Sequence, residues 1–176
     1  YTLAFLLVLY ASAPLQNDGL GWSNEKSLAL VGIYTMAAYT LPIIGSFIAD
    51  RFIGKGKSVI FGGCVIIFGH FFMLFSKNES IFYLALFCVA LGTAFFKPCM
   101  PSLLGDLYKP NDTRRESGFS WYYFGIHIGA MRAGISRGLL AQKLGYQIAL
   151  SSAGIGMVFG MFVFIFGRKY LVLEFV

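Results

Sequence analysis

Five stretches of about 20 mostly apolar residues follow one another along this chain, separated by short polar connections. A helix rises about 1.5 Å per residue, so each stretch is long enough to cross a hydrocarbon layer about 30 Å thick. The sequence therefore predicts an all-α integral membrane protein, with one transmembrane domain over residues 1–176. The expected helices are 28–49, 58–76, 81–104, 119–141 and 148–166.

The first residues, 1–13, are also apolar but too short to cross a bilayer. We interpret them as the end of a first helix whose beginning is absent, which makes a six-helix bundle with a truncated first helix. Ala11-Ser12-Ala13 resembles a signal-peptide cleavage site, but the stretch has no initiator Met and no basic leader. A fragment that begins within a helix is the simpler interpretation.

Composition supports a membrane protein and argues against other classes. Charged residues make up 12% of the chain and hydrophobic residues 57%, whereas soluble domains carry about twice that share of charge. The net charge of +6 is spread over several connections without a recognition motif, so no nucleic-acid partner is expected. Cys64, Cys88 and Cys99 all lie in apolar stretches and form no CxxC pair, so neither disulfides nor a metal site is expected.

The basic residues alternate between the two sides of the predicted bundle. Cytoplasmic connections are enriched in Lys and Arg, so the richer side faces the cytoplasm, and both ends of the chain with it. We expect a multi-pass protein of a bacterial-type inner membrane whose other partner is the lipid bilayer. The richer side carries Arg51, Lys55, Lys57, Lys109, Arg114, Arg115, Arg168 and Lys169, and the opposite connections carry Lys26, Lys77 and Lys143.

Lys97 lies inside the apolar stretch 81–104. A charge at the centre of a membrane helix costs about 2.5–3.5 kcal/mol on insertion scales, and such residues usually line a water-filled path or pair with a carboxylate. The alternative is a lysine whose head reaches back to the near membrane surface. Lys97 is therefore the first candidate for a functional residue.

The connection at 45–57 reads GSFIADRFIGKGK, a tight basic turn between two antiparallel helices. Its small residues let a neighbouring helix pass closely, and its charged residues stand at the membrane edge. The alternative is an ordinary solvated helix end. We select Gly45, Asp50, Arg51, Gly54 and Lys55 as gating or structural residues.

This turn resembles the loop between the second and third helices of the major facilitator superfamily, in the form found in proton-coupled oligopeptide transporters. Two further motifs are similar to that family: FKP at 96–98 followed by GDLY at 105–108, and FSWYYFGIHIGA at 119–130. The resemblance continues through residues 153–157 and 167–170, and so covers nearly the whole chain.

The resemblance implies the N-terminal half of a carrier with two six-helix halves, which binds substrate between them and works by alternating access. It implies symport of di- or tripeptides with protons, with the proton as coupling ion, no cofactor and no enzymatic activity. The absent C-terminal half would be a partner. Lys97 would meet the substrate carboxylate, with Tyr39, Tyr123 and His127 as further site residues and Asp106 in the gating motif.

Three of these residues are expected at similar depth in the membrane. Counted from the basic side, Lys97, His127 and Tyr39 lie roughly 10, 15 and 16 Å along their helices. Tyr39 also has an alternative role as a core residue, and nearby Pro42 is expected to bend its helix.

The chain also departs from the family pattern. His127 and Cys99 replace Asn, and Ala4 stands where a first-helix Arg usually supports substrate binding. His127 adds a group that titrates near neutral pH, or is a substitution with no role in transport. Arg132 and Arg137 stand where the family has apolar or small residues, and we interpret them as relaxed constraint.

Some polar and small residues inside the helices have simpler interpretations. His70 is expected to serve in packing. Gly62 and Gly63, and Gly156 with Gly160, are expected to let helices approach closely.

Three alternatives remain beside a peptide symporter. The first is a major facilitator carrier for another small solute, and the second is a non-functional transporter remnant. The third, a membrane enzyme, is disfavoured. Ser120 lacks the following Gly of a nucleophile turn, and the acidic residues stand at or near helix ends.

Overall fold

The computed structural model describes residues 2–14, 19–76, 78–109 and 111–167. The predicted basic residues Lys77, Arg168 and Lys169 lie outside these ranges, as does Tyr1. All regular secondary structure in the described ranges is helical, in agreement with the predicted fold class.

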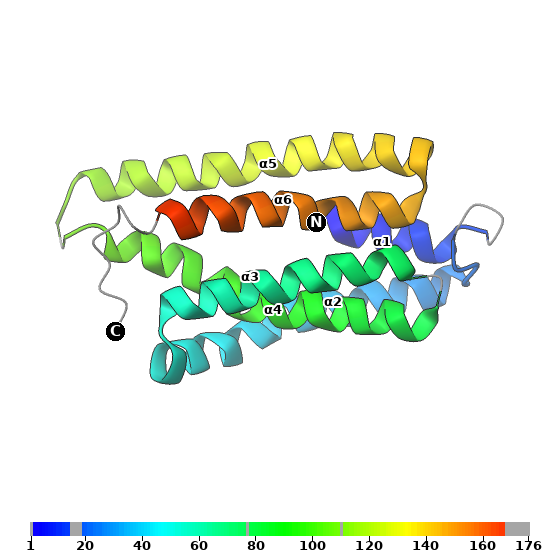
Figure 1. Cartoon of the computed structure of the whole chain (residues 1–176), viewed down its shortest axis with the longest axis horizontal. Helices are drawn as coiled ribbons and strands as arrows, with labels where there is room; N and C mark the ends of the chain where they lie inside the picture. The colour runs from blue at the N-terminus through cyan, green and yellow to red at the C-terminus, as the bar shows by residue number, and fades with distance from the viewer. Residues whose placement is uncertain (1, 15–18, 77, 110, 168–176) are drawn as a thin grey trace.

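The helices run along a common direction and form an elongated bundle (Figure 1). In chain order they are α1 (Thr2–Ser12), α2 (Asn24–Ile48), α3 (Lys55–Phe72), α4 (Glu79–Asp106), α5 (Arg114–Leu144) and α6 (Tyr146–Gly167). A π-helical turn, η2 (Ala49–Ile53), joins α2 to α3, and a 3-10 turn, η3 (Met73–Phe75), follows α3. Several helices extend beyond the predicted apolar stretches because polar caps and charged turns continue them.

Local sequence sets where the helices start and turn. Ser23 caps α2 by accepting the Lys26 amide at 3.3 Å, and Asn78 caps α4 by accepting the Ser80 amide at 2.9 Å. Gly54 precedes α3 with φ 85°, a conformation that side chains with a Cβ rarely adopt. These signals mark the starts of α2, α4 and α3.

We call the end with η2 and residues 107–113 the basic end, and the end where α2, α4 and α6 begin the opposite end. Each end has its own apolar cluster. The cluster at the opposite end includes Tyr10, Trp22 and Phe82, and the one at the basic end contains Ala49, Val59, Cys99 and Leu103. The Tyr10 hydroxyl is fully buried and donates to the Ser76 carbonyl at 2.9 Å, which ties α1 to the α3–α4 turn.

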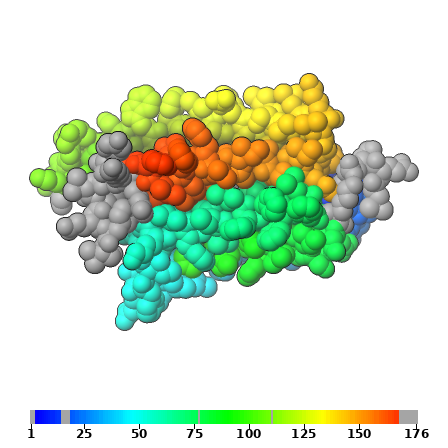
Figure 2. Space-filling view, viewed as in Figure 1, coloured from blue at the N-terminus to red at the C-terminus, as the bar shows by residue number. Residues whose placement is uncertain are grey.

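Among the described residues, four helices are long and apolar enough to span a membrane: α2 with η2, α3 with η3, α4 and α6. The predicted fifth span, 119–141, does form a helix, α5, but is not among them. The physical reason is its composition, because His127, Arg132 and Arg137 interrupt the apolar residues. In the space-filling view α6 lies between α5 and α3 on the face turned to the reader (Figure 2).

Candidate functional site: a lysine–tyrosine cavity

Lys97 of α4 and Tyr39 of α2 come together in the structure, as the sequence suggested. The Lys97 ammonium lies 4.2 Å from the centre of the Tyr39 ring, over its face. A cation in this position is attracted by the ring quadrupole, which holds the lysine head between the helices. Lys97 therefore points toward α2 and does not depend on an acidic side chain to stay in place.

A small, half-open cavity of about 140 Å³ borders this contact, and Lys97 and Tyr39 are both exposed. Lys97 supplies the one charge in its described lining, and two tyrosines and a threonine supply hydroxyls. Because that lining holds a cation and no carboxylate, it suits an anionic group. The walls come from α1, α2 and α4: Leu3, Ala4, Tyr34, Thr35, Ala38, Tyr39 and Lys97.

Ala4 belongs to this lining, although the sequence marked it only as a departure from the family. Tyr34 and Thr35 are site residues that the sequence analysis missed. Thr35 was within reach, because residues four apart share a helix face and Thr35 precedes Tyr39 by four. Tyr34 and Ala38 had no such signal, since the position of α1 decides which flank of α2 faces the cavity.

His127 and Tyr123 lie apart from the described lining of the cavity. Both are on α5 and exposed, and the Tyr123 ring packs against Tyr122 with centroids 5.4 Å apart. Similar depth along separate helices therefore did not bring His127 to Lys97 within the described structure. Its role in substrate binding stays a prediction.

The residues predicted to form a gating or structural motif lie toward the basic end, and two of them form an ion pair. Lys55 at the start of α3 forms an ion pair with Asp106 at the end of α4, with 2.7 Å between Nζ and Oδ2. Gly45 of α2 is buried against the backbone of Ala94 on α4, so a Cβ there would collide with a carbonyl oxygen. Asp50 and Arg51 are both exposed on η2. The motif thus links α2, α3 and α4 at one end.

His70 has the packing role that the sequence predicted. Its ring is buried between α3 and α6, and Nδ1 lies 3.0 Å from the Leu150 carbonyl, to which a protonated Nδ1 donates. Gly154 of α6 leaves room for the His70 side chain, because a Cβ there would stand 3.0 Å from the His70 Cβ. His70 therefore joins two helices and does not line the Lys97 cavity.

Arg137 has an environment that the sequence did not indicate. It is half-buried on α5. Arg132 is exposed. Within the described ranges no group of three His, Cys, Asp or Glu side chains is placed to hold a metal ion.

Comparison with known proteins gives this geometry a context. The chain is 36% identical over 169 residues to an uncharacterised transporter, YclF, of Bacillus subtilis, and 35% identical over 170 residues to a di-/tripeptide transporter of Lactococcus lactis. Each match covers 96% of this chain and 34% of the relative, so the chain spans about a third of their length.

Solved structures of peptide transporters also match this chain. The chain superposes with a TM-score of 0.93 on the crystal structure of a peptide transporter POT in complex with sulfate, at 34% identity. This match covers 97% of the chain and 35% of the transporter. The POT family transporter PepTSo gives a TM-score of 0.83 at 27% identity, over 97% of this chain and 35% of that one.

The family can be stated from these observations together. The model of the POT family matches residues 57–172, most of the chain. With its apolar helices and its transporter relatives, the chain is part of a multi-pass membrane protein of a transporter family. This chain belongs to the POT family.

Proposed function

We propose that this chain is part of a proton-coupled symporter for di- or tripeptides, and that Lys97 receives the substrate carboxylate. The observation that carries the proposal is the cation of Lys97, held over Tyr39 in a cavity whose described lining has no acidic side chain. A charged group in an apolar membrane helix costs free energy, and binding of an anionic group would offset that cost.

The relatives support the substrate class. Curated relatives in Lactococcus lactis and Yersinia enterocolitica are named as di-/tripeptide and peptide transporters. A mutant of the peptide transporter POT was solved with alafosfalin, and another POT family transporter with a thioalcohol-conjugated peptide. The remaining two-thirds of such a carrier would supply the other wall of the binding site.

We further propose that the protein resides in a bacterial-type inner membrane, with its basic end and both ends of the chain on the cytoplasmic side. The support is the excess of Lys and Arg in the connections at that end. Protons serve as the coupling ion in this proposal, and no cofactor takes part.

A carrier for another small solute is the second candidate. One residue in the lining of the cavity, Ala4, favours it. Ala4 contributes no charge where the family pattern has Arg, so one cation is missing from a peptide-type site. A POT family transporter at 27% identity was solved with 5-aminolevulinic acid. A small amino acid-like solute would need fewer charges than a peptide.

Uptake by the full-length protein that contains this chain tests the proposal. The protein is reconstituted in liposomes, and uptake of labelled dialanine is measured with an imposed pH gradient and after an ionophore collapses it. We expect gradient-dependent uptake that falls at least tenfold in Lys97→Gln. Lys143→Gln, a change of an exposed lysine at the opposite end, is the matched control and should retain uptake.

Two outcomes would contradict the proposal. Uptake of 5-aminolevulinic acid without uptake of dialanine would favour the second candidate. Stable insertion with no uptake of either compound would favour a non-functional remnant.

A further inference from the structure

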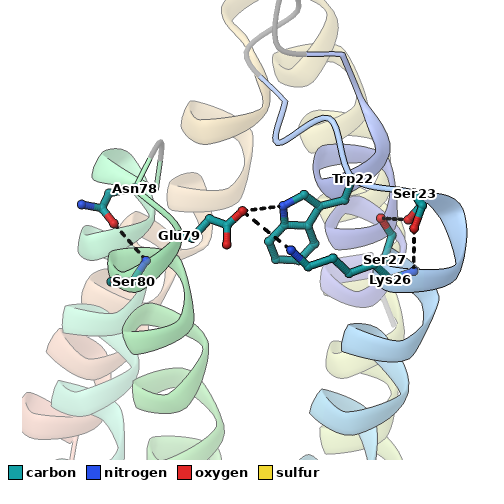
Figure 3. A network of polar contacts seen from close by, with 7 residues as sticks. All are labelled: Trp22, Ser23, Lys26, Ser27, Asn78, Glu79 and Ser80. Atoms are coloured by element: carbon teal, nitrogen blue, oxygen red, sulfur yellow. Dashed lines mark hydrogen bonds and ion pairs between the residues drawn. The ribbon is translucent and has the colours of Figure 1, made fainter.

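A compact group of polar and aromatic contacts joins α2 to α4 at the opposite end of the bundle (Figure 3). The Trp22 indole N–H donates to the Glu79 carboxylate at 2.8 Å, and the Lys26 ammonium lies 3.7 Å from the same oxygen. The Lys26 ammonium also lies 3.7 Å from the centre of the Trp22 ring. We call Trp22, Lys26 and Glu79 the clasp.

The Trp22 side of the clasp is buried in aromatic packing, and the Lys26–Glu79 side is open to water. The Trp22 ring is buried, stacks on Tyr83 at 5.9 Å between ring centres and meets the edge of Phe82. By contrast, the side chains of Lys26 and Glu79 are 48% and 54% exposed. The Lys26 and Glu79 charges can therefore separate into solvent without leaving a buried charge unpaired.

Two buried residues attach α2 closely to the described structure, and Leu30, Val31 and Tyr34 of α2 pack, partly buried, against the apolar cluster at the opposite end. The residues that α2 buries are Ser27, near the clasp, and Gly45, against the Ala94 backbone of α4. Between them Ile33, Met36 and Tyr39 are exposed. Pro42 lies inside α2 and lacks the N–H that would continue the helical hydrogen bonds. The part of α2 between the opposite end and Pro42 can therefore bend at this residue.

Tyr39 lies between these two attachments, and Lys97 lies on the helix to which both attach. Glu79 is the first residue of α4, and Lys26 stands in the first turn of α2. The same two helices thus carry the clasp at one end and the lysine–tyrosine contact near the middle. A change in the tilt of α2 at the clasp moves Tyr39 relative to Lys97.

We propose that the clasp is a positioning device, which sets the distance between Tyr39 and Lys97 and is coupled to occupation of their cavity. Coupling between two sites is reciprocal, so loss of the clasp weakens binding in the cavity, and a change in the cavity alters the surroundings of Trp22. The proposal rests on the proposed function only where it identifies the bound molecule as a peptide.

The test uses the full-length protein labelled with 5-fluorotryptophan and observed by ¹⁹F NMR, with the Trp22 signal assigned by its loss in Trp22→Phe. We expect Lys97→Gln to shift the Trp22 signal in the otherwise natural protein and to leave it unchanged in Glu79→Ala. This arm needs no substrate, so it stands even if peptide transport is not found.

The second arm measures dialanine binding by calorimetry. We expect Glu79→Ala to weaken binding at least fivefold, the lower range of typical allosteric coupling, and Glu79→Gln to weaken it less because its amide oxygen still accepts the indole N–H. Glu25→Ala is the matched control, since Glu25 is an exposed acid in the same turn of α2 as Lys26.

A purely structural role gives a different pattern. If Glu79→Ala lowers the melting temperature but behaves like Glu25→Ala in dialanine affinity, and Lys97→Gln moves Trp22 equally with and without Glu79, the proposal is overturned. If dialanine does not bind to the natural protein, the proposed peptide function fails while the NMR comparison still decides on the clasp.

Discussion

Helices α3 and α4 pack far more tightly against each other than α5 packs, although α5 also contains several glycines. A Cβ on Gly62 of α3 would stand 2.6 Å from the Gly92 carbonyl of α4, and a Cβ on Gly92 would stand 2.6 Å from the Gly62 carbonyl. On α5, by contrast, a Cβ on Gly125, Gly129 or Gly134 would meet no described atom within 4 Å. The two backbones of α3 and α4 approach closely, whereas these three glycines of α5 face open space.

The difference shows that glycine spacing alone does not locate a packed interface. Gly62 and Gly63 were predicted to allow close approach, and the structure confirms it for both. Gly156 and Gly160 of α6 were also predicted to allow close approach, but a Cβ on either one would meet no described atom within 4 Å. Within the described structure α5 buries none of its residues.

The largest expected effect follows directly from this comparison. Gly92→Ala places a methyl group against the backbone of α3, and overpacking of this kind costs about 1–3 kcal/mol of unfolding free energy. Gly129→Ala is the matched change on α5. It should be neutral or stabilise by up to about 1 kcal/mol, because Ala favours the helix and nothing described obstructs it.

Melting temperatures of the purified full-length variants in detergent measure both changes. Equal loss in Gly92→Ala and Gly129→Ala would break the comparison and show that α5 is covered in the whole protein.

The two histidines extend the same comparison to polar groups. His70→Ala removes the partner of the Leu150 carbonyl in a buried place and should cost about 1–3 kcal/mol. His127→Ala changes an exposed side chain on α5 and should stay within about 0.5 kcal/mol. Thermal unfolding of both variants checks this, and greater destabilisation by His127→Ala would contradict it.

The ion pair between Lys55 and Asp106 tests how firmly the basic end holds α3 to α4. Both side chains are partly exposed, so the expected coupling energy in a double-mutant cycle is about 0.2–1 kcal/mol. Stability of Lys55→Ala, Asp106→Ala and the double variant provides the cycle. The coupling should fall in high salt, and a value that salt leaves unchanged would be inconsistent with a screened pair.

The smallest expected effect lies at the start of α5. Hydrogen bonds from Arg114 lower the pKa of the Asp112 carboxyl below its usual value. A carboxyl with a lowered pKa in the folded state stabilises above its unfolded pKa, and this contribution disappears as pH falls through the folded value. The difference in melting temperature between the natural protein and Asp112→Asn should therefore shrink on acidification, and a growing difference would refute the assignment.

Sequence reasoning selected residues where a single position carried the signal. Lys97 was selected because a charge in an apolar helix is costly, and Tyr39 was selected from the family resemblance and its depth; the structure places the two in contact. It missed Tyr34 and Thr35 because the approach of α1 to α2 decides which side of α2 lines the cavity. It expected His127 only at a depth similar to that of Lys97, and depth carries no information on the direction that a helix face takes.

By itself the sequence determined the helical class of this protein, the starts of α2 and α4 and the positions of its costly charges. These depend on apolar length, capping and the price of desolvation, which are local properties of the chain. The tertiary structure alone decided that the Gly62 and Gly92 backbones touch, that Lys97 rests on Tyr39, and that Glu79 meets Trp22. Such contacts depend on how helices distant in sequence rotate and approach, because a side chain acts only on the neighbours that packing brings within a few ångströms.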